Sequence, residues 1–597
     1  MNKLLEYPFD SQLVLKKRKS IKKELLQENN AFLEKKVALL GGSTTNDIKD
    51  MLDLFLLNNG IKAQFYESEF GQYWQDAMFD NPELLEFKPD IIIIHTSNRN
   101  ISTYPCLEDN KIDIDKKLDI EFNKFSNMWE KLKSVYKCTI IQNNFEYPCY
   151  RLLGNMDVSD IHGKTNYITR LNQKFYEYAQ CNDSFYINDI NYLSANYGLE
   201  KWSDPFYWHM YKYALCLPAI PMLSFSLSNI IKSIYGKNKK AFALDLDNTL
   251  WGGVIGDDGV DNIEIGNETS LGQVYSEFQK YLSEYKSLGV LLNVISKNDR
   301  ENAIAGLNHP DSILKEEDFI MIKANWEPKS INLINMANEL SLAPESFVFV
   351  DDNPAEREIV RQQIKNVAIP ELDKVEHYIN VIDKSGYFEV TSLSKEDMSR
   401  NEMYKKNIAR SEAQLVFGDY NEYLKSLEMV ATIKPFEEIY LSRIAQLTNK
   451  SNQFNLTTKR YTQEDISKIA QDDNYVTLYG RLEDKYGDNG IVTLVIGEIK
   501  DHSLHIGLWL MSCRVLKRDM EFAMMDEVIK KAKALKLKKV VGYYFPTNKN
   551  GMVSDFYDKQ GFTLESEDEN GNKIWSYIIS DTYENKNNVI RISNQND

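Results

Sequence analysis

Short apolar runs alternate with longer segments of helical periodicity along most of this chain. Early examples are KVALLGG (36–42), DIIIIHTS (90–97) and CTIIQNN (138–144), with helical segments such as TNDIKDMLDLFLLNNG between them. This alternation is typical of α/β proteins, in which the runs become parallel strands and the periodic segments become helices. We therefore expect an α/β fold class with a parallel sheet in the N-terminal region.

Each apolar run of a second series ends in polar residues. These runs are KAFALDLD (240–247), VLLNVISKND (290–299) and SFVFVDDN (346–353), and a helical segment precedes each. Farther along, NYVTLYGRL, GIVTLVIGEI and SLHIGLWLMSC precede the helical MEFAMMDEVIKKAKALK. A chain of 597 residues is also too long for one ordinary core, so we expect a multidomain protein.

Changes in this pattern predict the domain organisation. The predicted parts are an N-terminal α/β region (1–222), a parallel α/β domain (223–375), a helical connector (376–420), an α+β domain (421–585) and a tail (586–597). The connector is rich in charged residues. The tail is polar, and we expect it to be frayed rather than packed on a domain.

Composition and charge narrow the class of protein. The formal net charge is −17, so we expect no nucleic-acid partner and no attraction to an anionic membrane. The N-terminus does not have the basic and then apolar pattern of a signal peptide, so we expect none. We also expect no membrane-spanning helix, because the apolar runs are shorter than the roughly 18 residues that a span needs. The cysteines are scattered without metal-site spacing: Cys106, Cys138, Cys149, Cys181, Cys216 and Cys513. A reducing cytoplasm is the expected location.

The polar strand ends of the second domain carry the strongest chemical signal. Ligand sites lie beyond the carboxyl ends of parallel strands, so these residues are expected to meet at one edge of the sheet. They are Asp245, Asp247, Thr249, Ser296, Lys329, Asp351 and Asp352. Four converging carboxylates repel one another unless a cation neutralises them. Oxygen ligands without His or Cys favour Mg²⁺.

These residue types suit phosphoryl transfer to a carboxylate. Asp245 is the candidate nucleophile, and Asp247 is the candidate general acid and base. The candidates for holding the phosphoryl oxygens are Thr249, Ser296 and Lys329. The candidate metal ligands are Asp245, Asp247, Asp351 and Asp352.

The order DxDxT, strand-end Ser, Lys and strand-end DD resembles the haloacid dehalogenase (HAD) superfamily. The resemblance implies a Rossmann-like parallel sheet and a Mg²⁺-dependent phosphatase or phosphotransferase. No large insertion separates the motifs, so we expect a site without a cap domain. The segment WGGVIGDDGVDNIEI (251–265) is predicted to form a flap, as a β-hairpin that turns at Asp-Gly.

A narrower resemblance is carried by DLDNTLWGGVIGDDG (245–259), TNKSNQFNLTTKRYT (448–462), DKYGDNGIVTLV (484–495) and the region around CRVLKRD. These blocks resemble FkbH-like proteins of HAD subfamily IIIC. The resemblance implies an enzyme that takes a glyceryl group from 1,3-bisphosphoglycerate and removes phosphate. It also implies delivery of the acyl group, through a cysteine thioester, to the phosphopantetheine thiol of an acyl carrier protein.

The last domain has a strand–helix layout that resembles the GNAT acetyltransferase fold. Cys513 is the candidate thioester residue, since the following Arg514, Lys517 and Arg518 favour a thiolate. The usual R-x-x-G-x-G/A loop here ends at Asp519 and lacks both glycines, so a carrier-protein arm is a better expected ligand than free CoA. Tentative candidates for the acyl or carrier site are Asn452, Asn455, Asp488, Asn489 and Arg514. For the Asp-Asn-Gly segment, a turn is an equally good interpretation.

Ser43 follows the first strand and vaguely resembles the nucleophile block of SGNH hydrolases. Those enzymes need a late D-x-x-H pair, whereas Asp204 and His209 are five positions apart. We therefore expect an SGNH/flavodoxin-like region that is non-catalytic.

Two other functions remain open from the sequence. One is a stand-alone Mg²⁺-dependent phosphatase of a small phosphorylated metabolite, with inert flanking domains. The other is a non-catalytic adaptor in a polyketide or polysaccharide pathway. The complete set of DxDxT, Ser, Lys and DD motifs argues against the adaptor, because a binding module needs no intact metal shell.

Overall fold

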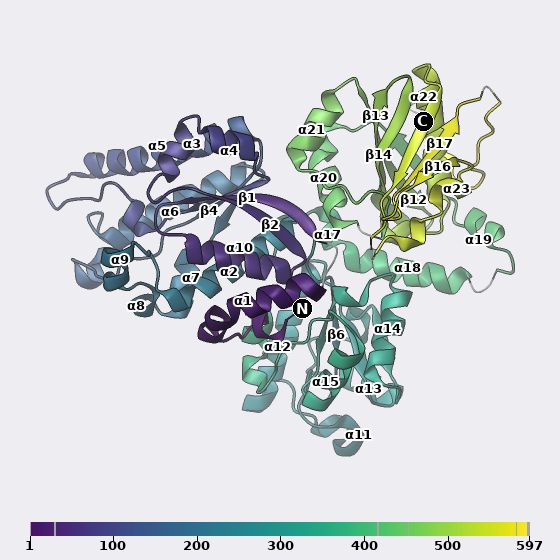
Figure 1. Cartoon of the computed structure of the whole chain (residues 1–597). Coiled ribbons are helices and arrows are strands. Elements are labelled where there is room, and N and C mark those ends of the chain that lie inside the picture. Colours follow the sequence, from purple (N-terminus) through teal and green to yellow (C-terminus); the bar gives the residue numbers. More distant parts are fainter. Residues whose placement is uncertain are drawn as a thin grey trace. The chain divides into compact units, whose positions relative to one another are not determined.

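The computed structural model describes residues 2–28, 32–414, 417–451, 453–547, 549–580 and 582–593. The chain divides into two compact units, Met1–Ile234 and Tyr235–Asp597. In Figure 1 the first unit runs from purple to blue and the second from teal to yellow. The boundary falls at the end of helix α10 (Ile220–Ile234), later than the change in sequence pattern near residue 223.

The first unit contains a five-stranded parallel sheet in the order β2-β1-β3-β4-β5. The strands are β1 (Leu33–Gly41), β2 (Ile61–Glu67), β3 (Ile91–His95), β4 (Thr139–Asn143) and β5 (Phe185–Asn188). This strand order is that of flavodoxin-like sheets. The flavodoxin-like layout predicted for the N-terminal region is therefore confirmed.

Helices cover both faces of this sheet (Figure 1). Helices α5 (Lys111–Tyr136) and α6 (Lys164–Cys181) pack on one face, where Trp129 and Phe175 are fully buried. Helix α2 (Asn46–Asn58) packs against α10 and α1 (Ser11–Glu28).

One segment of the described chain, Leu217–Ile234, is long and apolar enough to cross a membrane by length and composition. Such a segment was not expected from the sequence. Of this segment, 67% is buried inside the protein, as in the core helix of an ordinary domain.

The second unit begins with a four-stranded parallel sheet in the order β8-β7-β6-β9. The strands are β6 (Ala241–Leu244), β7 (Asn293–Ser296), β8 (Met321–Ala324) and β9 (Phe347–Val350). The edge strand β8 was not predicted, because its residues are only partly buried and its apolar run is short. The other three strands lie where the apolar runs placed them.

The segment predicted as a flap hairpin has a different structure. Gly252 and Glu264 pair as a single antiparallel bridge, but the tip is the short helix α11 (Ile255–Asp258) rather than a β-turn. The prediction of a β-hairpin is therefore wrong. Asp258 Oδ2 accepts a hydrogen bond from Val254 N at 2.8 Å, and this contact turns the chain before the Asp-Gly pair is reached.

A larger mixed sheet follows, in the order β16-β17-β15-β14-β13-β12-β10-β18. Its main strands are β10 (Val430–Lys434), β12 (Tyr475–Asp484), β13 (Gly487–Lys500), β14 (Ser503–Met511), β15 (Lys539–Tyr544), β16 (Thr563–Glu567) and β17 (Lys573–Ile578). Strands β14 and β15 are parallel, with helix α22 (Met520–Ala534) between them in the chain. This order with one internal parallel pair is the GNAT-like layout predicted for the domain.

Helices connect the two sheets, as the charged segment suggested. They are α16 (Tyr378–Lys384), α17 (Lys395–Met398), α18 (Arg400–Gln414) and α19 (Tyr420–Ser426). The predicted fraying of the tail is wrong for its described part. Arg591 and Ile592 form strand β18 beside β10, and Ile590 is buried.

Candidate active sites

The carboxyl edge of the four-stranded sheet brings together most of the predicted phosphoryl-transfer residues. Asp245 directly follows β6, Asp351 directly follows β9, and these strands are neighbours in the sheet. Lys329 opens helix α14 (Lys329–Glu339), and its Nζ lies 2.7 Å from both Asp245 Oδ2 and Asp351 Oδ2. The three side chains are buried. The predicted convergence of distant motifs therefore occurs.

Asp245, Asp351 and Asp352 have one carboxylate oxygen each within 4.8 Å of one another. The second oxygen of Asp245, Oδ1, is buried without a hydrogen-bond partner among the described residues. A buried anionic oxygen without a donor is costly unless a cation or ligand approaches it. These residues therefore fit a hard divalent cation such as Mg²⁺.

Asp247, also expected as a metal ligand, does not join this carboxylate group. Its Oδ1 accepts hydrogen bonds from Trp251 Nε1 at 2.9 Å and from Ile255 N at 3.1 Å. Its Oδ2 accepts one from Asn298 Nδ2 at 3.2 Å. Trp251 and Ile255 of the flap segment therefore fix the orientation of this carboxylate.

Burial changes the protonation of this site. It raises the pKa of Asp247, with a smaller contribution from the charge of Asp245. The same two causes raise the pKa of Asp351 to about 6 and also raise that of Asp352. Burial opposes the charged form of Lys329, but the neighbouring carboxylates outweigh it and raise the Lys329 pKa.

The remaining phosphate-binding candidates lie at the same edge. Thr249 is fully buried, and its Oγ1 accepts a hydrogen bond from Asp352 N at 3.3 Å. Ser296 ends β7, the strand on the other side of β6. Sequence reasoning missed Arg357, whose Nη1 donates to the backbone oxygens of Asp351 and Asp352 at 2.7 Å each. Its position six residues after Asp351, on helix α15 (Pro354–Gln363), was the available signal.

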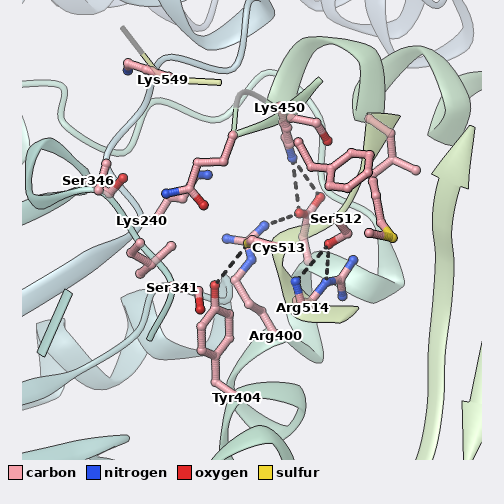
Figure 2. A pocket seen from close by; sticks show the side chains of 18 of the residues that line it. Lys240, Ser341, Ser346, Arg400, Tyr404, Lys450, Ser512, Cys513, Arg514 and Lys549 are labelled. Carbon is pink, nitrogen blue, oxygen red and sulfur yellow. Dashed lines mark hydrogen bonds and ion pairs between the residues drawn. The ribbon is translucent and has the colours of Figure 1, made fainter. Parts of the chain in front are cut away.

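Cys513 lies in a separate cavity of about 430 Å³ within the second unit. It follows β14, at the start of a short 3-10 turn (Cys513–Val515), and is half-buried. Figure 2 shows the Tyr404 hydroxyl directed at the sulfur, and Tyr404 Oη lies 3.9 Å from Cys513 Sγ. Lys240 and Arg514 both lie near enough to Cys513 for electrostatic interaction.

The cationic neighbours of Cys513 are only partly those predicted. Arg514 lines the cavity, but Lys517 is exposed and Arg518 is engaged elsewhere. Arg518 Nη1 lies 3.0 Å from Asp484 Oδ2 in a buried ion pair. Its guanidinium is therefore committed to that carboxylate rather than to the thiol.

Of the tentative acyl-site residues that the structure describes, Arg514 lines this cavity, whereas Asn455, Asp488 and Asn489 do not. Asn455 Oδ1 accepts from Thr458 N at 2.8 Å, and Asn489 Nδ2 donates to Leu482 O at 3.2 Å. Asp488 pairs with Arg481 and accepts from Gly490 N at 2.7 Å. The Asp-Asn-Gly segment lies within strand β13 rather than in a turn, since the hairpin turn falls before it, at residues 485–486. Asn452 lies outside the described residues.

Sequence reasoning missed Lys240, Arg400, Tyr404 and Arg443 as cavity residues. Arg400 and Tyr404 stand four positions apart on helix α18, a spacing that places both on one helix face. That spacing could have indicated a shared site from the sequence. No sequence pattern relates Lys240 or Arg443 to Cys513, because they come from unrelated segments.

In the first unit, Ser43 and His95 lie at the carboxyl edge of the sheet. Ser43 Oγ and His95 Nε2 are buried without hydrogen-bond partners among the described residues. His95 Nδ1 lies 2.7 Å from Asn143 Nδ2, and burial lowers the His95 pKa to about 4. Asp204 Oδ1 accepts from Phe206 N at 2.8 Å as a helix cap. Among the described residues, no hydrogen bond or ion pair joins these groups into a hydrolase triad.

Comparison with known proteins gives a direct result for the first unit. Residues 36–232 match the family model described as FkbH, N-terminal domain. The FkbH-like resemblance predicted from motifs farther along the chain is thus confirmed. No curated protein matches this chain.

A solved structure is similar to most of this chain. It is the N-terminal part of BF1531 from Bacteroides fragilis, which contains a phosphatase domain complexed with Mg. The identity is 29%, the TM-score is 0.58, and the match covers 63% of this chain and 99% of that chain. The HAD-like phosphatase fold predicted from the motifs is confirmed.

Two acetyltransferases are similar to about a quarter of the chain. The ribosomal-protein-S18-alanine N-acetyltransferase from Escherichia coli is 13% identical, covering 26% of this chain and 98% of that chain, with a TM-score of 0.21. A GNAT-family acetyltransferase from Streptococcus pneumoniae is 17% identical, and the match covers 25% of this chain and 99% of that chain, with a TM-score of 0.22. With TM-scores this low, the GNAT-like assignment depends on the strand order and the parallel β14–β15 pair.

Proposed function

We propose that this protein takes a glyceryl group from 1,3-bisphosphoglycerate, removes its phosphate and loads it through Cys513 onto an acyl carrier protein. The observation that supports the phosphatase part is the buried arrangement of Lys329 between Asp245 and Asp351. The observation that supports the transfer part is the cavity that surrounds Cys513.

In the phosphatase part, Asp245 Oδ1 attacks phosphorus while Lys329 holds Oδ2. The bond between phosphorus and the leaving oxygen breaks, and Asp247 gives that oxygen a proton. The raised Asp247 pKa favours the protonated form that this role needs. Water then attacks phosphorus, Asp247 accepts its proton, and inorganic phosphate leaves. Asp245, Asp351 and Asp352 would hold Mg²⁺, which supplies positive charge to the phosphoryl oxygens when bound.

In the transfer part, the Cys513 thiolate attacks the acyl carbon of the acyl phosphate. The new S–C bond replaces the C–O bond to phosphate, which leaves as inorganic phosphate. Phosphopantetheine thiolate of the carrier protein then attacks the thioester and regenerates Cys513. The replacement of both loop glycines, by Lys517 and Asp519, supports a carrier-protein arm rather than free CoA. We also propose a cytoplasmic location, in keeping with six free cysteines.

Intact mass spectrometry tests both parts in one experiment. Full-length protein and Mg²⁺ are mixed with 1,3-bisphosphoglycerate, generated in situ, and a pantetheinylated carrier protein. The wild type should add a glyceryl increment to the carrier. Cys513→Ala should lose the increment and keep phosphatase activity on the phosphorylated acid, while Asp245→Asn should lose that phosphatase activity.

Cys181→Ala is a matched control, because Cys181 is free and exposed on the first unit. It should behave as the wild type. Phosphate release with an unmodified carrier would favour the stand-alone phosphatase. Absence of any Mg²⁺-dependent turnover would favour the adaptor.

A further inference from the structure

The cavity around Cys513 holds more positive charge than its own carboxylates neutralise. Six of its lining side chains are Lys or Arg, and three are Asp or Glu. The chain as a whole carries a formal charge of −17. A positive cavity in an acidic protein is therefore a local feature rather than a reflection of composition.

Three of the six cations are paired within the cavity. Asp397 lies 3.1 Å from Lys450 Nζ and also pairs with Arg400. Glu345 lies 2.8 Å from Lys549 Nζ. The dashed contacts in Figure 2 include those of Lys450 and Arg400.

The other three cations, Lys240, Arg443 and Arg514, have no carboxylate within 4.0 Å among the described residues. Arg443 Nε is buried and has no hydrogen-bond partner in that set. Arg514 Nε donates only to the neutral Ser512 Oγ, at 3.2 Å. Burial lowers the pKa of Lys240 and of Arg514, and lowers that of Arg443 to about 10.

The three cations are half-buried. Positive charges that are partly withdrawn from water and have no carboxylate in direct contact are costly, so they are stabilised when an anion binds to them. A phosphate group is a suitable anion because Arg and Lys donors bind its oxygens strongly. A cavity of about 430 Å³ is in the range of small-molecule sites.

We propose that Lys240, Arg443 and Arg514 form a phosphate subsite that binds a phosphorylated ligand with its reactive end at Cys513. This inference deepens the proposed function and rests on it for the choice of ligands. The shared chemistry is a phosphate on a short organic chain. It can belong to the phosphorylated acid or to the phosphopantetheine arm.

The test measures alkylation of Cys513 by neutral iodoacetamide, followed by peptide mapping of the full-length protein. The competitors are 3-phosphoglycerate against glycerate, and phosphopantetheine against pantetheine. The phosphorylated member of at least one pair should protect Cys513, and its unphosphorylated counterpart should not. Which pair responds identifies the source of the phosphate. Phosphate bound at Asp245 does not register, because the readout is Cys513 itself.

Variants then assign the protection to the three cations. Lys240→Gln and Arg443→Gln should each weaken protection by about tenfold, the loss of one charge-assisted contact. Lys530→Gln is the matched control, because Lys530 lies on α22 with 72% of its side chain exposed. It should leave protection unchanged.

A measurement without variants keeps the inference testable if a variant fails to fold. In the wild type, the ratio of Cys513 labelling to labelling of the exposed Cys181 should be measured with each reagent. The ratio should be higher with anionic iodoacetate than with neutral iodoacetamide. Equal preference for the two reagents, or equal protection by phosphorylated and unphosphorylated ligands, would overturn the subsite. Carrier loading that fails while phosphate protection persists would overturn only the proposed transfer, so the two failures can be told apart.

Discussion

Lys329 Nζ lies 2.7 Å from Asp351 Oδ2, and the side chains are 4% and 0% exposed. The same ammonium lies 2.7 Å from Asp245 Oδ2. One buried cation therefore holds the candidate nucleophile and a candidate metal ligand together. This arrangement makes the stability of the site dependent on Lys329 and on pH.

Lys329→Met should lower the free energy of unfolding of the Mg²⁺-free protein by about 3 kcal/mol at pH 7, because two buried carboxylates lose their counterion. The loss should be smaller at pH 5, where Asp351, with a pKa of about 6, takes up a proton. Urea denaturation measures both values.

Lys323→Met is the control for that substitution, because Lys323 pairs with Glu339 at 2.7 Å in a partly exposed position. Its cost should stay below about 1 kcal/mol. Equal losses for the two variants would contradict a special role of the buried pair.

Mg²⁺ affinity should increase as the pH rises through about 6. Burial, helped by the charge of Asp245, raises the Asp351 pKa to about 6, so the protonated form prevails below that pH. Because Mg²⁺ binds the carboxylate, affinity should change by up to about tenfold per pH unit below the pKa and level off above it.

The raised Asp351 pKa has the opposite effect on the stability of the metal-free protein, which should fall as the pH rises. The pKa of Asp351 is higher in the folded protein than in the unfolded chain. Asp351 therefore lowers the free energy of unfolding progressively as the pH rises from about 4 through 6. Calorimetry at pH 5, 6 and 7 measures the binding. A pH-independent affinity would mean that Asp351 is not a ligand.

Trp251→Phe should raise the pKa of Asp247 further, because the indole Nε1 donates to Asp247 Oδ1 at 2.9 Å. Loss of a donor to a carboxylate disfavours its charged form. Because the Asp247 carboxyl also loses a contact that positions it, we expect the phosphatase kcat to fall by about tenfold. The limb of its pH profile that reports Asp247 should move to higher pH.

Trp509→Phe is a matched control for lost ring volume. Trp509 is equally buried, and its Nε1 has no hydrogen-bond partner among the described residues. The phosphatase pH profile of that variant should match the wild type. A shift in both variants would point to general destabilisation instead.

Asp484→Asn should destabilise the protein by about 3 kcal/mol, because Asp484 neutralises two buried arginines. Its Oδ1 lies 2.6 Å from Arg410 Nη2 and its Oδ2 lies 3.0 Å from Arg518 Nη1. Thermal unfolding of purified variants measures the change.

Asp488→Asn removes a more exposed carboxylate that pairs with Arg481. We expect it to cost less than about 1 kcal/mol. A similarly small effect of Asp484→Asn would show that Arg410 and Arg518 find other partners.

The sequence by itself determined the phosphoryl-transfer site. Apolar runs predict strands, and in a parallel sheet every strand delivers its last residues to the same edge, so Asp245, Ser296 and Asp351 could be placed together without coordinates. Local turn geometry was less predictable. The flap tip is helical because Asp258 bonds back to Val254 N, a choice that the Asp-Gly pair alone did not indicate.

Only the tertiary structure decided the surroundings of Cys513. Its cavity draws on Lys240 before β6, Arg443 on α20 (Leu441–Lys450), and Arg400 and Tyr404 on α18. No periodicity relates such distant segments, because their meeting depends on how two sheets and their connecting helices pack. The same packing committed Arg518 to Asp484 and left Lys240 facing the thiol cavity. The shared carboxyl edge of parallel strands thus defined one site, whereas the packing of unrelated segments built the other.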